Sequence, residues 1–255
     1  MRRPAGWCAA LAAFALLGTA GTLVTARADG HAGASQQAPA PAAAPPHTVL
    51  ATGDSMIQLV DRYLARRLEP GGRAKVHSDS RIGTGISKPA LLNWPRHAAS
   101  QARQLHPRAT VVFLGANDGF NVRSASRRLA RCCGRAWSRE YGRRARRMMV
   151  SYSQAGAGRV YWLLLPQARA GFFRRVYPAV NKGLRQAARG LTGVRLIHLN
   201  RVFTPGGRYR KFMRYRGRRV RVRQGDGIHL SLTGASIAAS LVVRRITTDR
   251  ALADR

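Results

Sequence analysis

The sequence is short of acidic residues and of lysine. Ten Asp and Glu residues face 45 Lys and Arg residues, which gives a formal net charge of +35, and only four of these cations are lysines. This balance predicts attraction to an anionic polymer. An alternative of about equal weight is that a GC-rich genome raised arginine together with alanine and that the arginines form a solvated surface. No zinc-finger, RNA-recognition or homeodomain signature is present, so we expect no nucleic acid partner.

Cysteine occurs three times, and no two cysteines have the spacing of a metal site. Cys8 falls in the N-terminal segment, which leaves Cys132 and Cys133 for the rest of the chain. Adjacent cysteines rarely form a disulfide with each other. The pair is interpreted either as oxidised in an export compartment or as two small buried groups. We expect neither a metal nor another cofactor.

An apolar stretch near the N-terminus predicts export. Residues 1–28 combine a basic start at Arg2 and Arg3, an apolar run over 8–24 and an Ala-Arg-Ala cleavage site. They are interpreted as a signal peptide of a periplasmic or secreted protein. An uncleaved N-terminal membrane anchor is the alternative, because the run is near the lower limit for spanning a bilayer. Contact with a membrane is expected only in that case.

The remaining chain divides into a linker and one domain. Residues 29–46 are rich in Ala, Pro, Gly, Ser and Gln without apolar periodicity, which is typical of a flexible tether. Residues 47–255 then form the folded domain, which is long enough to bury a full core. No internal repeat is found.

Within the domain, strand-like and helix-like segments alternate. The strands are near-continuous apolar runs, as expected when helices cover both faces of a parallel sheet. The pattern predicts an α/β fold with three α/β/α layers and a flavodoxin-like sheet in the order 2-1-3-4-5. Expected strands are 47–53, 74–78, 110–114, 159–165 and 194–199, and expected helices are 56–68, 89–105, 137–154, 172–188 and 232–245. Residues 201–223 break the alternation and are interpreted as a turn followed by a hairpin or lid.

A serine lies where the first strand meets the first helix, in Gly53-Asp54-Ser55-Met56. A turn at this corner of an α/β sheet can expose a hydroxyl as a nucleophile. Alone, the motif is equally typical of a helix N-cap. Asp54 is expected to brace the corner or to cap the helix.

Three further blocks support the catalytic interpretation. They are Ile82-Gly83-Thr84-Gly85, Gly115-Ala116-Asn117-Asp118 and Asp226-Gly227-Ile228-His229. In order and approximate spacing the four blocks resemble those of the SGNH (GDSL-like) hydrolases, from about residue 47 to about residue 243. Within that superfamily they look most like a branch of exported bacterial envelope proteins of unknown function.

The blocks contain a candidate triad. Ser55 needs a general base, and the base needs an orienting carboxylate. His229 follows Asp226 by three residues on a short loop before the last helix, so both can reach Ser55. The other six histidines have no such setting and receive no catalytic role: His31, His47, His77, His97, His106 and His198.

A tetrahedral intermediate also needs fixed donors for its oxyanion. The backbone amide of Ser55 and the side chain of Asn117 can supply two of them, although Asn117-Asp118 is also typical of an ordinary strand-end turn. The resemblance assigns a third donor to the glycine loop, where we favour Gly85 over Gly83. Trp94 and Asp118 are expected to bind substrate, and Trp162 is expected in the core.

Together these features predict an exported serine esterase of SGNH type that removes O-acyl, most plausibly O-acetyl, groups from an envelope or extracellular carbohydrate. Two alternatives stay open. The same residues suit an O-acyltransferase that passes the acyl group to a sugar hydroxyl. A non-catalytic protein that binds polyanions would keep the fold but would not need all of the motif residues.

Overall fold

The structure, a computed structural model, describes residues 45–124 and 126–253. The predicted signal peptide or anchor and nearly all of the predicted linker lie outside the described residues, so that division of the chain stays a prediction. Among the described residues, no helix combines the length and the apolar character needed to cross a bilayer.

Five parallel strands form the central sheet, in the order β2-β1-β3-β6-β7. This is the flavodoxin-like order predicted from the sequence. The inner strands are apolar because helices cover both faces of the sheet, and all five residues of β3 are buried. The edge strand β2 is largely polar and exposed. Their bounds are β1 His47–Gly53, β2 Ala74–Ser80, β3 Ala109–Phe113, β6 Arg159–Leu163 and β7 Val194–Ile197.

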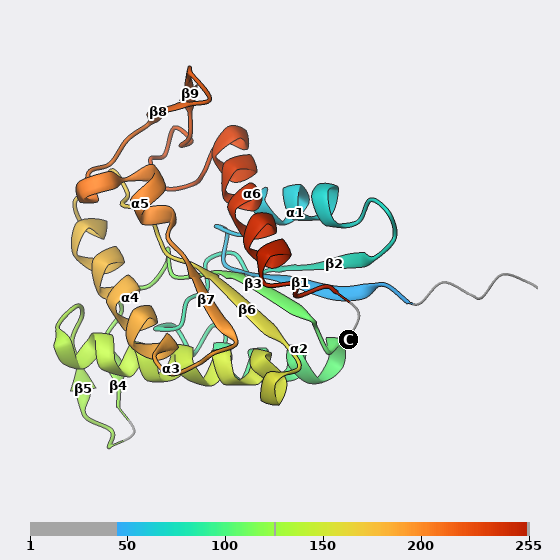
Figure 1. Cartoon of the computed structure of the whole chain (residues 1–255). Helices are drawn as coiled ribbons and strands as arrows, with labels where there is room; N and C mark the ends of the chain where they lie inside the picture. Colours follow the sequence, from blue (N-terminus) through green and yellow to red (C-terminus); the bar gives the residue numbers. More distant parts are fainter. Residues whose placement is uncertain (1–44, 125, 254–255) are drawn as a thin grey trace, which may run out of the picture. The chain divides into compact units, whose positions relative to one another are not determined.

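Helices form a layer on each face of the sheet (Figure 1). On one face α1 (Val60–Leu68) and α6 (Leu232–Thr248) pack against each other. On the other face α3 (Arg135–Ser153) packs between α2 (Trp94–Leu105) and α4 (Phe173–Ala188). The predicted three-layer α/β/α architecture is therefore confirmed.

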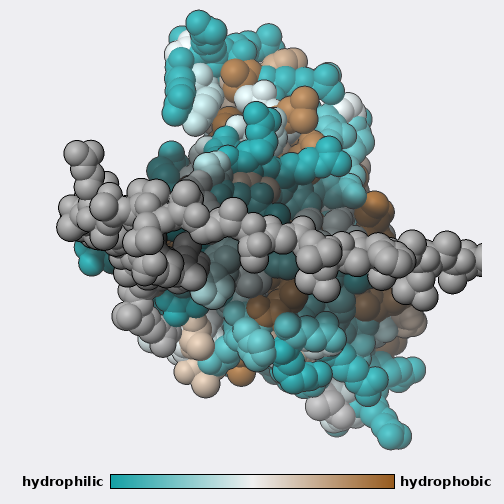
Figure 2. Space-filling view, turned by 90° about the vertical axis from the view of Figure 1, so that its right-hand side faces the viewer, coloured by the Kyte–Doolittle hydropathy of each residue, from teal (hydrophilic) through white to brown (hydrophobic). Residues whose placement is uncertain are grey.

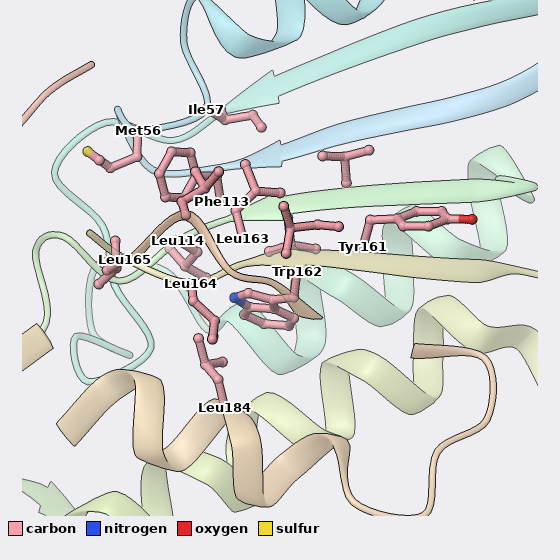
Figure 3. Packing of buried hydrophobic residues seen from close by; sticks show 14 of the residues in the cluster. Met56, Ile57, Phe113, Leu114, Tyr161, Trp162, Leu163, Leu164, Leu165 and Leu184 are labelled. Carbon is pink, nitrogen blue, oxygen red and sulfur yellow. The ribbon is translucent and has the colours of Figure 1, made fainter. Parts of the chain in front are cut away.

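The core lies between the sheet and these helix layers. Figure 3 shows Trp162 of β6 on the side of the sheet that faces α4, from which Leu184 points back toward it. Both side chains are fully buried, together with Phe113 and Leu163. The predicted core position of Trp162 is confirmed.

Two helices begin later than predicted. α1 begins at Val60 instead of residue 56, because Leu59 has a left-handed backbone with φ of 68° and separates the helix from the turn that carries Ser55. α2 begins at Trp94 instead of residue 89, because the Asn93 side chain accepts a hydrogen bond from the Arg96 amide and caps the helix there.

Smaller elements fill the connections. A hairpin of β4 (Val122–Arg123) and β5 (Leu129–Ala130) precedes Cys132 and Cys133, which are joined in a disulfide. The predicted strand end near residue 199 is instead the short helix α5. The other connecting elements are η1 Gln154–Gly156, α5 Leu199–Phe203 and η2 Pro205–Gly207.

The arginine-rich segment forms a hairpin, one of the two forms predicted for it. Strands β8 (Phe212–Tyr215) and β9 (Arg218–Arg221) pair antiparallel and project beyond α5 and α6 in Figure 1. In Figure 2, hydrophilic residues predominate wherever the grey atoms leave this face visible, and hydrophobic residues form small separate patches. The surface seen there agrees with the highly charged composition.

Candidate active site

Ser55 lies on a tight turn at the carboxyl end of β1. Strand β1 ends at Gly53, where a Cβ atom would lie 2.0 Å from the carbonyl oxygen of Phe113 in β3. Only glycine allows this approach of the two strands, so the chain can turn directly beside β3. Ser55 is half-buried, and α1 does not begin until Val60.

Asp54 holds this turn against the end of β3. One carboxylate oxygen accepts a hydrogen bond from the Met56 amide at 2.9 Å, and the other accepts from the amides of Gly115 and Ala116, both at 2.9 Å. Burial raises the pKa of Asp54 to about 6, while the three amide hydrogen bonds act in the opposite direction. The predicted bracing role of Asp54 is confirmed.

The structure brings Ser55, His229 and Asp226 into one hydrogen-bonded row. His229 Nε2 lies 2.8 Å from Ser55 Oγ, and His229 Nδ1 lies 2.5 Å from an Asp226 carboxylate oxygen. With the proton assigned to Nδ1, Nε2 is left to accept the proton of the serine hydroxyl.

The loop before α6 fixes Asp226 in its place. Its other carboxylate oxygen accepts hydrogen bonds from the amides of Ile228 at 2.8 Å and His229 at 3.1 Å. Partial burial raises the pKa of Asp226, but the hydrogen bonds from the His229 ring and from these two amides outweigh it and lower the pKa overall. The carboxylate is therefore held in its ionised form beside the imidazole.

Arg223 anchors this loop to the rest of the domain. Its side chain is fully buried, and it donates to the carbonyl of Ile228 at 2.5 Å and to those of Pro166 at 3.0 Å and Gln167 at 2.5 Å. Burial lowers the pKa of Arg223 to about 10. The sequence alone does not indicate this role, because nothing in the residue type separates Arg223 from the exposed arginines near it.

Asn117 presents an unused donor to the same site. Its Nδ2 atom is buried and has no hydrogen-bond partner within the described residues, and the residue lines a pocket together with Ser55 and His229. A buried amide without a partner is costly in a folded protein unless something else binds it. This is the setting expected of an oxyanion donor.

Of the two glycines in the glycine loop, Gly83 lines the pocket over Ser55 and Gly85 does not. Gly83 has φ of 74°, lines the pocket and has open space around its Cβ position. Gly85 is buried, and a Cβ atom there would lie 2.6 Å from a carboxylate oxygen of Asp118. The oxyanion donor of the glycine loop stays a prediction, and the position of Gly83 in the pocket lining favours Gly83 over Gly85.

The side chains of Trp94 and Asp118 are buried and neither residue lines the pocket over Ser55, which contradicts the prediction that they bind substrate. Trp94 is fully buried and donates from its ring nitrogen to Thr84 Oγ1 at 3.1 Å. Asp118 is 1% exposed and accepts hydrogen bonds from the amide and hydroxyl of Ser87 and from Tyr141. Burial raises the pKa of Asp118. Both side chains support the glycine loop from the protein side.

The pocket over Ser55 has a volume of about 580 Å³. Ile82, whose side chain is 66% exposed, Arg62 and Gln224 contribute to its lining beside the motif residues. These three residues were not predicted from the sequence, since none of them belongs to a recognisable motif. Within residues 45–124 and 126–253, no three His, Cys, Asp or Glu side chains come together so as to hold a metal ion.

Solved structures with the same architecture are found at low sequence identity. The C-terminal catalytic domain of peptidoglycan O-acetyltransferase A from Streptococcus pneumoniae is 14% identical, with a TM-score of 0.51 over 80% of this chain and 94% of that domain. A family 3 carbohydrate esterase from Talaromyces cellulolyticus is 14% identical, with a TM-score of 0.53 over 79% and 97%. A protein from Slackia heliotrinireducens assigned to the SGNH hydrolases is 18% identical, with a TM-score of 0.52 over 78% and 98%.

The chain therefore has the fold of the SGNH hydrolases, as the four sequence blocks predicted. Residues 48–245 match the family described as "Protein of unknown function (DUF459)", and the chain belongs to this family. No curated protein is found to match the sequence.

Proposed function

We propose that the protein is a serine esterase of SGNH type that hydrolyses O-acyl esters, most plausibly O-acetyl esters, on a carbohydrate polymer outside the cytoplasm. The observation that carries this proposal is the hydrogen-bonded row from Ser55 through His229 to Asp226. The unused donor of Asn117 in the same pocket supports it.

In the first half-reaction Ser55 Oγ attacks the acyl carbonyl carbon and passes its proton to His229 Nε2. The carbonyl electron pair moves onto oxygen, where the Ser55 amide, the Gly83 amide and Asn117 Nδ2 supply hydrogen bonds. When the intermediate collapses, the bond to the sugar oxygen breaks and that oxygen takes the proton from His229. The products are a free sugar hydroxyl and an acyl group on Ser55.

In the second half-reaction water attacks the acyl carbon while His229 accepts one water proton. Collapse of this intermediate breaks the bond to Ser55 Oγ, which recovers its proton from His229, and the carboxylic acid leaves. Asp226 stays ionised throughout and stabilises the imidazolium that forms in each step. The lowered pKa of Asp226 suits this role.

The choice of a carbohydrate ester rests on three supports. The N-terminal segment resembles an export signal, the positive charge favours an anionic polymer, and the fold is shared with a carbohydrate esterase and with a peptidoglycan O-acetyltransferase domain. The transferase domain also supports a second candidate, in which a sugar hydroxyl replaces water in the second half-reaction. Both reactions share the acyl-Ser55 intermediate, so only the acceptor separates them.

Turnover of 4-nitrophenyl acetate by the purified protein without residues 1–28, compared with Ser55→Ala, tests the proposal. We expect steady hydrolysis by the wild type, labelling of Ser55 by a fluorophosphonate probe, and loss of both in the variant. Equal activity or labelling in Ser55→Ala would refute the assignment. A folded wild type that is neither labelled nor active would favour the non-catalytic, polymer-binding alternative.

The acceptor is tested separately with an O-acetylated polysaccharide and an added oligosaccharide. Release of free acetate in proportion to ester loss supports an esterase. Recovery of the acetyl group on the oligosaccharide instead identifies an acyltransferase.

A further inference from the structure

A second pocket lies at the carboxyl ends of β6 and β7. Its volume is about 380 Å³, which falls within the range of about 300 to 1,000 Å³ common for small-molecule sites. Its lining includes Gln167, which follows β6, and Asn200, Gly206 and Gly207, which follow β7. None of the residues assigned to the reaction belongs to this lining.

Two buried polar atoms in this pocket have no partner. Gln167 is 8% exposed, and its Nε2 donor forms no hydrogen bond within the described residues. The Oδ1 acceptor of Asn200 is also buried and unbonded there. Unpaired buried polar atoms are costly, so a donor and an acceptor in one pocket indicate a ligand that can serve both. A hydroxyl group does so.

Two arginines give the pocket a positive charge. Arg185 of α4 and Arg201 of α5 both line it, and within the described residues no carboxylate forms an ion pair with either. Burial, followed by the nearby charge of Arg201, lowers the pKa of Arg185. An anion would relieve this repulsion, and a guanidinium matches a carboxylate in shape as well as charge.

We propose that this pocket binds a sugar that carries a carboxylate, with the carboxylate against Arg185 and Arg201 and a neighbouring hydroxyl against Gln167 and Asn200. This inference rests on the proposed function, because it names an acidic sugar unit as part of the polymer that the esterase acts on.

The position of the pocket suits a polymer that also reaches Ser55. Both sites lie at the carboxyl edge of the sheet, where β6 and β7 are two and three strands away from β1. Neighbouring strands are about 4.8 Å apart, so the two sites are separated by roughly 10 to 15 Å along this edge. A bound chain would thus place the esterified sugar and the acidic sugar a few units apart.

Calorimetric titration of the Ser55→Ala protein with glucuronate, glucose and glucose 6-phosphate tests the proposal. Binding is measured without turnover, so failure of the pocket and failure of the esterase proposal appear in different experiments. We expect saturable binding of glucuronate, at least about tenfold tighter than that of glucose, because the charge-assisted hydrogen bonds are absent in glucose.

Two substitutions locate the binding. Arg201→Gln removes one exposed charge, and Gln167→Leu removes the buried donor, so each should weaken glucuronate binding by about tenfold or more. Arg103→Gln removes an equal charge from an exposed position on α2 and should leave binding unchanged. Thermal unfolding of each variant checks that it is folded.

Several results would overturn the proposal. Absence of saturable glucuronate binding would show that the pocket does not hold a sugar carboxylate. Equal binding of glucose would remove the role of the arginines, and tighter binding of glucose 6-phosphate would replace the carboxylate by a phosphate. Weakening by Arg103→Gln equal to that by Arg201→Gln would show a general charge effect outside the pocket.

Discussion

Beside Ser55, the carboxylates of Asp54 and Asp226 are each held by several hydrogen bonds, whereas the arginines of the β8–β9 hairpin face solvent. Asp54 and Asp226 each accept three hydrogen bonds. In the hairpin, Arg216, Arg218 and Arg219 are exposed, and Arg219 lies over the ring of Phe212 at 4.2 Å. Beside Ser55 a single substitution should therefore change activity or stability strongly. In the hairpin only the summed charge of the arginines should affect binding.

The largest expected effect on activity is at the hydrogen-bonded row of Ser55, His229 and Asp226. His229→Ala should lower kcat for 4-nitrophenyl acetate by roughly 10⁴- to 10⁶-fold, as should Ser55→Ala, because each removes the same proton transfer. The double variant should be little worse than either single one, since the groups act as a unit. Steady-state kinetics of the three variants check this. Losses that multiply in the double variant would contradict a shared role.

The next effect is at Asn117. Asn117→Ala should lower kcat by about 100- to 1000-fold with little change in KM, because the side-chain amide bonds the oxyanion chiefly in the transition state. Kinetics and thermal unfolding are measured together.

Asn93→Ala is the matched control for Asn117→Ala, since it removes an asparagine that caps α2. It should cost about 0.5 to 2 kcal/mol of stability and leave kcat of the folded enzyme near normal. If Asn117→Ala behaves in the same way, Asn117 is a structural turn residue.

The third effect is the pH dependence that Asp54 contributes to stability. Its pKa rises from 3.8 to about 6 on folding, so the folded protein holds this proton more tightly than the unfolded chain. Protonated Asp54 therefore adds about 3 kcal/mol to the free energy of unfolding below about pH 4, and this stabilisation is lost as the pH rises to about 6. Urea unfolding of wild type and Asp54→Asn between pH 4 and pH 7 measures it. A wild-type minus variant difference that stays constant over this range would contradict the prediction.

The smallest expected effect of a single substitution is the loss of one arginine from the β8–β9 hairpin, which should change glycan affinity only slightly. Affinity for an acidic glycan should fall steeply between low salt and physiological salt, where the screening length is about 8 Å. Turnover of a small neutral ester should barely change over the same range. Combined replacement of Arg216, Arg218 and Arg219 by Gln should weaken glycan binding, measured by a pull-down or by interferometry.

Removal of three exposed arginines elsewhere, at Arg103, Arg139 and Arg250, is the control for net charge. It should weaken glycan binding less than the hairpin replacements do. Equal weakening would show that the total charge attracts the polymer, and no weakening in either variant would leave the arginines as a solvated surface produced by composition.

The sequence predicts the sheet more closely than it predicts the ends of the helices. Apolar runs mark the buried strands, as in β3, and the alternation of strands and helices predicts the parallel sheet and its flavodoxin-like order. The start of α1 does not, because it depends on the bond between Asp54 and the Met56 amide and on the backbone of Leu59. Asp54 is held in this position by the amides of Gly115 and Ala116, which come into reach only after β1 and β3 have paired.

A similar limit applies to the site. The motif blocks predict that Ser55, His229 and Asp226 meet, and the structure places them together, while their catalytic roles stay proposals. Burial of Trp94 could not be foreseen, since a tryptophan beside a glycine loop is typical of a sugar-binding wall as well as of a core. Asp118 likewise turns inward to Ser87 and Tyr141, which are distant in sequence.

The hydrogen bond between Ser55 and His229 joins residues 174 positions apart. Ser55 follows the first strand and His229 precedes the last helix, and α1 and α6 pack together beside them. The proposed activation of Ser55 by His229 therefore requires that both ends of the domain have assembled. Reaction of Ser55 with a fluorophosphonate would then count completely folded molecules, and during refolding its appearance should coincide with the final step and not precede it.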